Sequence, residues 1–290
     1  APCAVHCPLG LCVQGYAGHI AAGQYAQALA LIMSRLPLPD SVCRVCHKPC
    51  EDVCVRAGHD GPVAINDLKR FVMDWAAEQE TSPYAPAMEA DHGRRVAIVG
   101  AGPAGLAAAH DLRRRGYEVT LFDAEAEPGG LLRYGIPRFR LPPEVLQRDV
   151  DRVLGLGVTF HGNRVLGTDV DLAGLLDAHA AVFLAVGAQV PIRLELPSQS
   201  GAPSAIDALA YLKAARAGAR RSARRVVVIG GGNAAVDASR VARRSGGEQV
   251  VIAYRRGREQ MPAIATEILA AVEEGIELRT HVQAVALVTG

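Results

Sequence analysis

The stretch Val96-Ala-Ile-Val-Gly-Ala-Gly-Pro-Ala-Gly105 decides the fold of the region around it. Its first four residues form an apolar run typical of a buried strand, and the helix-forming residues 106–115 follow it. The first glycine of the loop allows a tight turn, the second lets the backbone approach a pyrophosphate, and the third lets helix and strand pack closely. This pattern predicts a dinucleotide-binding loop. Its candidate binding residues are Gly100, Gly102, Pro103, Ala104 and Gly105.

A second strand and an acidic residue complete this unit. Gly116 ends the helix, Glu118–Phe122 is a second apolar run, and Asp123 follows it where a dinucleotide site carries its ribose-binding carboxylate. The pyrophosphate would lie at the helix N-terminus, where free N–H groups favour negative charge. A tight turn without a ligand is the alternative, and the flanking strand, helix and carboxylate disfavour it. The sequence therefore predicts parallel strands joined by a right-handed crossover.

The same order of elements recurs about 130 residues later in the chain. Residues 226–229 and 249–253 have the character of strands, and 234–244 that of a helix. The loop Gly230-Gly-Gly-Asn-Ala-Ala235 is a variant of the first, and its candidate residues are Gly230, Gly232, Asn233, Ala234 and Ala235. Arg255 and Arg256 stand where an NAD site would have an acid, which favours the 2′-phosphate of NADP. A solvated arginine loop is the alternative reading.

All seven cysteines lie in the first 54 residues. An odd count ahead of α/β units disfavours a disulfide scaffold and favours metal or cluster ligation. Cys46, Cys50 and Cys54 have a spacing that would place them near one face of a helix, and the Cys7-Pro8 step is familiar from ferredoxins. Iron–sulfur clusters are the favoured reading, with zinc and free thiols as alternatives. Cys12 is expected to be a packed thiol, and the ligand candidates are Cys3, Cys7, Cys43, Cys46, Cys50 and Cys54.

Composition narrows the class of protein. Lys and Arg number 31 against 30 Asp and Glu, so no general basic field favours nucleic acid. No apolar run reaches the roughly 18–20 residues that span a bilayer, and no signal-peptide layout opens the chain. A cytoplasmic protein without a nucleic-acid or membrane partner is expected. Glu267, Glu273 and Glu274 lie on a predicted helix, 263–274, as a solvated face.

Several motifs together resemble the family of the glutamate synthase small (beta) subunit. Its relatives include the N-terminal part of dihydropyrimidine dehydrogenase and the NADPH-binding subunit of bifurcating transhydrogenase. The resemblance rests on the cysteine stretches 3–8 and 45–54, on Pro62–Phe71, on Gly129-Gly130, on Gly135–Pro142, and on 230–237 with Met261-Pro-Ala263. It implies an α/β protein in which a helical head with [4Fe–4S] clusters precedes an FAD-binding Rossmann-type domain, which carries an inserted NAD(P)H-binding Rossmann-type domain.

The resemblance also implies roles for particular residues. FAD would contact the first loop, Asp123, Gly129, Gly130 and Leu131, while Gly187 ends a strand, 181–186, beside it. NADP(H), less so NAD(H), would occupy the second loop. Cys3 and Cys54 would serve one cluster, and Cys7, Cys46 and Cys50 the other. The expected domains are 1–85 (iron–sulfur), 93–221 (FAD) and 222–290 (NAD(P)H).

Three departures from the family pattern stand out. The Cys-x2-Cys pair that normally precedes the equivalent of Cys3 does not occur in this sequence. Lys69 stands where some relatives place a Glu or Gln ligand, and an ammonium cannot bind iron, so Cys43 is the expected fourth ligand. The sequence ends at Gly290 within the second nucleotide-binding unit, so a fragment truncated at both ends is expected.

The implied function is an electron-input module. NAD(P)H would give a hydride to FAD, and single electrons would leave through two clusters to a catalytic partner subunit or a fused domain. No catalytic acid or base is required. A ferredoxin-linked, formate-linked or bifurcating reductase subunit is a second possibility within this family. A zinc-stabilised nucleotide-binding scaffold is the non-catalytic alternative.

Overall fold

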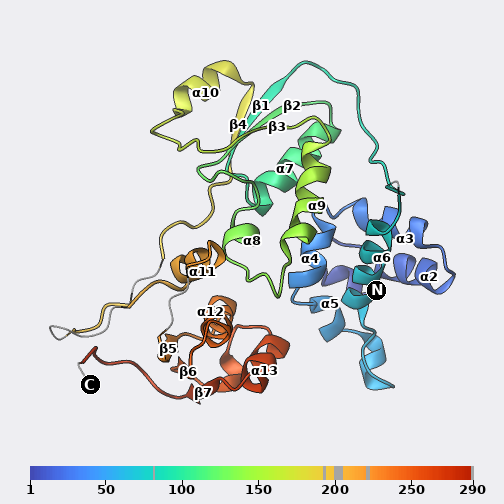
Figure 1. The fold of residues 1–290 in the computed structure, drawn as a ribbon. Helices are drawn as coiled ribbons and strands as arrows, with labels where there is room; N and C mark the ends of the chain where they lie inside the picture. Colours follow the sequence, from blue (N-terminus) through green and yellow to red (C-terminus); the bar gives the residue numbers. More distant parts are fainter. Residues whose placement is uncertain (81, 192–193, 199–204, 220–222, 289–290) are drawn as a thin grey trace. The chain divides into compact units, whose positions relative to one another are not determined.

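The computed structural model describes residues 1–80, 82–191, 194–198, 205–219 and 223–288 (Figure 1). These form two compact units. One contains residues 1–133 and 140–187, and the other contains residues 134–139 and 188–290. The expected α/β fold with parallel sheets is confirmed. The three domain boundaries expected from the sequence remain predictions.

The first 77 residues, all of which the structure describes, form helices joined by loops and turns and contain no strand. Residues 13–33 form two helices, because Gly23 adopts a left-handed conformation (φ +70°) between them. Leu68, Val72 and Trp75 recur at helical spacing and lie in one helix, residues 65–77. A core of Tyr16, Leu29, Ile32, Val72 and Met73 joins these helices. The elements are α1 (Pro2–Val5), α2 (Val13–Ala21), α3 (Tyr25–Met33), α4 (Pro39–Val45), α5 (Pro49–Asp52), η1 (Val55–Gly58) and α6 (Ile65–Ala77).

Two expectations about the cysteines are wrong. Cys46, Cys50 and Cys54 do not share one helix, since Cys46 ends α4, Cys50 lies in α5 and Cys54 precedes η1. The break comes from Lys48, which is left-handed (φ 64°), and from Pro49, which has no N–H to continue the α4 ladder. Cys12 is not a packed thiol, because it is exposed at the N-terminus of α2.

The first sheet has four parallel strands in the order β3-β2-β1-β4. Its central strand β1 is fully buried after its first residue, and the buried side chains Leu106 and Ala109 of α7 are characteristic of a helix packed on a sheet. The elements of this region are β1 (Arg95–Val99), α7 (Pro103–Arg114), β2 (Glu118–Phe122), α8 (Leu131–Tyr134), α9 (Pro143–Leu154), β3 (Thr159–His161), α10 (Leu172–Ala178) and β4 (Ala181–Leu184). The strands and the helix predicted for this region are confirmed, and their ends agree with the prediction to within three residues.

A buried ionic network joins α4 of the helical region to α9. Asp40 and Asp149 are 1% and 0% exposed. Arg152 pairs with both, at 2.8 and 2.6 Å, and Arg148 pairs with Asp40 at 2.9 Å. The carboxylate of Asp149 also accepts hydrogen bonds from the backbone N–H groups of Asp40 and Ser41. Two buried carboxylates therefore depend on one arginine that both share.

The second sheet has three parallel strands in the order β5-β6-β7. Its core contains Val236 of α12, Ile252 of β6 and Ile268 of α13. Residues 134–139 belong to this unit, where the Phe139 ring lies under the guanidinium groups of Arg240 and Arg244. The elements are α11 (Ala208–Arg216), β5 (Arg225–Ile229), α12 (Asn233–Arg244), β6 (Gln249–Tyr254), η2 (Arg258–Gln260), α13 (Ala265–Glu273) and β7 (Glu277–Thr280).

The expectation that Glu267, Glu273 and Glu274 form only a solvated face is wrong for two of them. Arg240, 8% exposed, pairs with Glu267 and Glu274, and Arg244 pairs with Glu274 at 2.7 Å. Glu273 is exposed. Among the described residues, none of the helices has the length and apolar character needed to cross a bilayer.

Candidate functional site

The first glycine loop has the geometry of a strand-to-helix turn that a side chain would block. Gly100 is left-handed (φ +107°), and a Cβ there would lie 2.2 Å from the carbonyl oxygen of Ala185. A Cβ on Gly105 would lie 1.8 Å from the carbonyl oxygen of Gly100. Pro103 takes the first position of α7, where its missing N–H costs no helical hydrogen bond. The loop thus delivers an open helix N-terminus to the carboxyl end of β1.

Two further segments border this loop. The N–H of Gly129 donates to the carbonyl oxygen of Ala101 at 2.8 Å, so the turn of Gly129 and Gly130 lies against the loop. Leu131 begins α8 and is 52% exposed. The nearest atom to a Cβ on Gly102 would be the Cα of Gly130, at 3.8 Å, which leaves the backbone of Gly102 accessible. These residues fit a cradle for a pyrophosphate-bearing cofactor, and their roles toward FAD stay predictions.

Asp123 lies at the end of β2 and braces the loop. Its carboxylate accepts hydrogen bonds from the N–H of Ala101 and, at 2.8 Å, from the N–H of Glu125. A carboxylate has lone pairs beyond these two bonds, so a ribose hydroxyl can still donate to it. Gly187 (φ +71°) follows β4, which is hydrogen-bonded directly to β1. The structure therefore places Asp123 beside the first loop, and Gly187 just beyond the strand next to it.

The second loop shows the same turn in the other unit. Gly230 is left-handed (φ +139°), and Gly232 caps α12 with nothing within 4 Å of the place a Cβ would take. The side-chain oxygen of Asn233 accepts a hydrogen bond from the N–H of Ile264 at 3.0 Å, which ties the loop to the segment before α13. Ala234 and Ala235 continue the first turn of α12, and Ala235 is buried. The space beside Gly232 fits a second pyrophosphate.

Arg255 and Arg256 directly follow β6 and are exposed. Within the described part of the chain, neither guanidinium forms an ion pair with a carboxylate. The N–H of His281 donates to the carbonyl oxygen of Arg256 at 3.2 Å, which holds the backbone of this turn in place. Two cations without a carboxylate partner suit a 2′-phosphate, whose oxygens accept charge-assisted hydrogen bonds.

The predicted cluster ligands gather only in part. Cys43 and Cys50 are buried in the core around Tyr16, and Cys3 and Cys7 pack against it. Cys46 and Cys54 accept hydrogen bonds at sulfur from the N–H groups of Lys48 (3.3 Å) and Val63 (3.5 Å). All seven cysteines are free thiols. In the described residues, no three side chains among His, Cys, Asp and Glu lie close enough to hold a metal ion.

The chemistry of the donors nevertheless fits an iron–sulfur site. Soft thiolate ligands inside an apolar core are what such clusters require, and backbone N–H groups directed at sulfur are a known influence on their potentials. Burial raises the pKa of the Cys43 thiol to about 12, and the nearby Lys69 ammonium partly offsets this. Lys69 itself is only 6% exposed. The ligand assignments remain predictions.

Sequence reasoning missed two residues that shape these sites. The ring of Tyr254 packs against Gly231, and its hydroxyl donates to the carbonyl oxygen of Gln260 at 2.8 Å, so it supports the second loop. Its place at the end of β6 was the available signal. Lys69 is identified from the sequence only as a residue unable to bind iron, because its burial beside Cys43 and Cys50 depends on residues that are distant in the chain.

The two glycine loops and the cysteine-rich head define a class of nucleotide-dependent redox proteins. Residues 94–289 match the family described as pyridine nucleotide-disulphide oxidoreductase, and residues 1–81 match dihydropyrimidine dehydrogenase domain II, 4Fe-4S cluster. The chain belongs to the pyridine nucleotide-disulphide oxidoreductase family. The 4Fe-4S match decides against zinc for the head, and FAD, NADP(H) and [4Fe–4S] are the cofactors to which the matched families correspond.

Curated relatives agree with the resemblance expected from the motifs. The chain is 38% identical to the NADP(+)-dependent formate dehydrogenase subunit beta of Moorella thermoacetica, over 99% of this chain and 44% of that protein. It is 37% identical to the NADPH-Fe(3+) oxidoreductase subunit beta of Geobacter sulfurreducens (97% and 43%). It is 36% identical to the glutamate synthase [NADPH] small chain of Escherichia coli (97% and 62%). The chain thus spans about half the length of these relatives.

Solved structures share the fold. FprA of Mycobacterium tuberculosis in complex with NADPH superposes with a TM-score of 0.53 at 25% identity, over 63% of this chain and 48% of that one. Histamine dehydrogenase from Rhizobium sp. 4-9 has a TM-score of 0.54 at 17% identity, over 91% of this chain and 39% of that one. At this level of identity the likeness shows a shared fold alone.

Proposed function

We propose that this chain is the NADPH-oxidising, electron-input part of a larger flavin- and iron–sulfur-dependent oxidoreductase. One observation carries the proposal: two parallel sheets each present a glycine loop at a strand-to-helix turn, and only the second is followed by two exposed arginines. The difference assigns the loops to different nucleotides. The first suits FAD, and the second suits NADPH.

When bound, the cofactors supply the redox chemistry, with hydride passing from NADPH to the flavin and single electrons leaving through the clusters. The residues of this chain bind and orient them. The helix N-terminus after Gly102 neutralises pyrophosphate charge, Asp123 holds the loop in shape, and Arg255 with Arg256 selects the 2′-phosphate. No side chain of the described residues is assigned a proton transfer.

The test is an NADPH-driven dye-reduction assay on the full-length protein with Arg255→Ala and Arg256→Ala variants. Each lost charge-assisted contact is worth about 1.5–3 kcal/mol, so the KM for NADPH should rise roughly 10- to 100-fold while that for NADH stays constant. Arg279→Ala is the matched control, because Arg279 pairs with Glu277 on the surface. Activity with NADH alone would overturn the role of the arginine pair.

Metal analysis separates this proposal from a nucleotide-binding scaffold. Iron, inorganic sulfide and flavin should be found together in the purified full-length protein, with a visible spectrum that NADPH bleaches. A zinc-containing protein without iron and flavin would sink the enzyme proposal. A cytoplasmic location accompanies the proposal, because reduced thiols are needed to bind clusters and all seven cysteines are free.

We infer further that a catalytic partner subunit or a fused domain receives the electrons. The proposal is supported by the names of the relatives, which are subunits or chains of larger enzymes. A glutamate synthase or a formate-linked complex fits equally well with what this chain carries. Dye reduction should proceed without the partner, whereas turnover of the final substrate should require it.

A further inference from the structure

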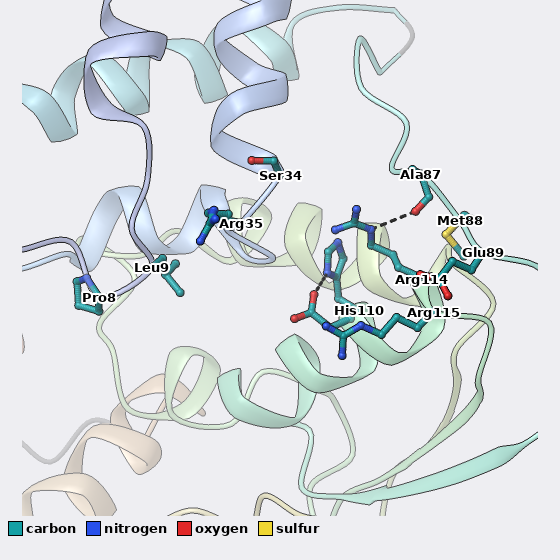
Figure 2. Close-up of a pocket in the computed structure, with 11 residues that line it drawn as sticks. Pro8, Leu9, Ser34, Arg35, Ala87, Met88, Glu89, His110, Arg114 and Arg115 are labelled. Carbon is teal, nitrogen blue, oxygen red and sulfur yellow. Dashed lines mark hydrogen bonds and ion pairs between the residues drawn. The ribbon is translucent and has the colours of Figure 1, made fainter. Parts of the chain in front are cut away.

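An open hollow of about 610 Å³ lies within the first compact unit (Figure 2). Its walls come from three separate stretches of the chain: the turn after Cys7, the end of α3, and the segment 87–89 together with the C-terminal half of α7. It lies apart from both glycine loops, since no loop residue lines it. Neither nucleotide site explains it.

The hollow carries an excess of positive charge. Arg35, Arg114 and Arg115 line it, and in the described residues none of these guanidinium groups forms an ion pair with a carboxylate. Arg114 donates only to the carbonyl oxygen of Ala87, at 3.3 Å. Elsewhere in the same unit Arg148 and Arg152 pair with acids at 2.6 to 2.9 Å. Three guanidinium groups without a carboxylate partner around one hollow favour the binding of a negatively charged partner.

The acidic groups at the hollow do not cancel this charge. Asp111 lies 2.8 Å from the Nδ1 of the buried His110 and is engaged there. Burial lowers the pKa of His110 in spite of Asp111, and Arg114 and Arg152 lower it further. Glu89 is the other carboxylate in the lining. Three arginines therefore face two acids, one of which is already bound.

The exposed apolar residues that line the hollow indicate that the binding partner is a protein. Leu9 is 41% exposed and Met88 is 44% exposed, and both line the hollow. Sites for small molecules enclose most of the ligand, whereas of this lining only His110 is buried. Methionine and arginine are enriched in protein interfaces, where apolar contacts lie inside a charged rim. The surface matches a partner with an apolar centre and acidic surroundings.

The hollow also lies beside a predicted cluster ligand. The N–H of Gly10 donates to the carbonyl oxygen of Cys7 at 2.8 Å, which closes a turn with Pro8 and Leu9 at its tip. An Nη of Arg35 lies 3.8 Å from the place a Cβ on Gly10 would take. Leu9 is two residues from Cys7, no more than about 7 Å along the chain. A partner on Leu9 would therefore lie close to whatever Cys7 binds.

We propose that this hollow is the docking surface for a small, acidic, one-electron carrier protein. The inference rests on the proposed function, because only an electron-input module has electrons to exchange there. Each docking event moves one electron from the head to the carrier. Two such transfers balance the oxidation of one NADPH to NADP⁺ and one proton. Charge complementarity makes the encounter fast and dependent on salt, as is usual for weak redox complexes.

The test measures binding and electron transfer separately on the full-length, cofactor-loaded protein. The probe is an acidic plant-type [2Fe–2S] ferredoxin, titrated in its oxidised form at low and at 0.5 M salt, with basic cytochrome c as the probe of opposite charge. The variant carries Arg35→Glu, Arg114→Glu and Arg115→Glu. The control is Arg94→Glu, which makes one charge reversal on a residue that does not line the hollow. An Arg→Met version of the triple variant guards against misfolding caused by the new acids.

Ferredoxin binding should weaken about 10-fold or more in both triple variants and in high salt, and should stay within about twofold in Arg94→Glu. NADPH-driven reduction of a small dye should be unchanged in all of them. Equal ferredoxin binding by wild type and the triple variants would overturn the docking proposal. So would preferred binding of cytochrome c, or arginine-dependent binding of sodium pyrophosphate without ferredoxin binding. Arginine-dependent ferredoxin binding with no dye reduction in wild type would instead overturn the proposed function and keep the docking surface.

Discussion

Replacing Arg152 with Met should destabilise the first compact unit far more than replacing Arg148. Arg152 pairs with both Asp40 and Asp149, which are almost fully buried, whereas Arg148 pairs at close range with Asp40 alone. Methionine keeps much of the arginine's apolar stem, so the change removes mainly charge and hydrogen bonds. In Arg148→Met, Arg152 still compensates both carboxylates. In Arg152→Met, no cation of the described residues remains paired with Asp149.

The size of the effect follows from the burial of the carboxylates. Breaking a buried ion pair by removing one partner costs about 3–5 kcal/mol, because the remaining charge is left uncompensated away from water. The loss of Arg148, whose side chain is 32% exposed, should cost about 1 kcal/mol or less, as for pairs near the surface. With a urea m-value of about 2 kcal/mol per molar, the midpoint should fall by roughly 1.5–2.5 M for Arg152→Met.

Urea unfolding followed by the fluorescence of Trp75 measures this difference. Trp75 is the single tryptophan of the 290 residues and lies in α6, against the ring of Tyr25 in the helical region. The FAD-loaded protein should be used throughout, since bound cofactor adds equally to each variant. Equal midpoints for Arg148→Met and Arg152→Met, or a loss below about 1 kcal/mol in both, would refute the view that Arg152 contributes more than Arg148 to balancing the buried carboxylates.

Further predictions concern pH, the nucleotide loop and the head. Burial, together with the nearby charge of Asp40, raises the pKa of Asp149 to about 6. The folded protein therefore holds this proton more tightly than the unfolded chain, so the resulting stability is fully present below about pH 4 and is lost as the pH rises through 6. In urea unfolding measured across about pH 4–7, the Asp149→Asn variant should lack this pH dependence. Gly232→Ala should fill the open space beside the second loop and weaken NADPH binding by calorimetry, while flavin content stays normal. Lys69→Met should lower a cluster midpoint potential by tens of millivolts in an EPR redox titration, because a buried cation stabilises the reduced form; an unchanged potential would place Lys69 away from the cluster.

The nucleotide loops could be predicted from sequence because their determinants are local. A strand, a glycine turn and a helix occupy consecutive residues, and the left-handed backbone conformation at Gly100 is indicated by the glycine itself. The strands at 118–122 and 226–229 were found for the same reason, since short apolar runs bounded by turns fit a buried parallel sheet. Each of these features is fixed within about ten residues.

Features that depend on distant residues could not be predicted. Asp40 and Asp149 meet across 109 positions, and no periodicity relates them. The glutamates at 267 and 274 looked solvated until α12 brought Arg240 beside them. The spacing of Cys46, Cys50 and Cys54 in the sequence is that of one helical face, but the left-handed Lys48 and the proline after it interrupt the helix. Residues four apart in the sequence share one face of a helix only where the backbone between them is helical.

The ionic network and the hollow depend on the same junction. The hollow is lined by Leu9 and Arg35 of the helical region and by Arg114 and Arg115 at the C-terminal end of α7, so its shape exists only while these two regions are packed together. The α4–α9 network holds that packing with buried charges, and the charge of Arg152 reaches His110, the buried residue of the hollow's lining. An uncompensated charge at this junction would cost energy whether or not a carrier binds. The arginines that face the hollow, by contrast, have no carboxylate partner among the residues that the structure describes, and such a charge is satisfied by water or by an acidic surface from outside.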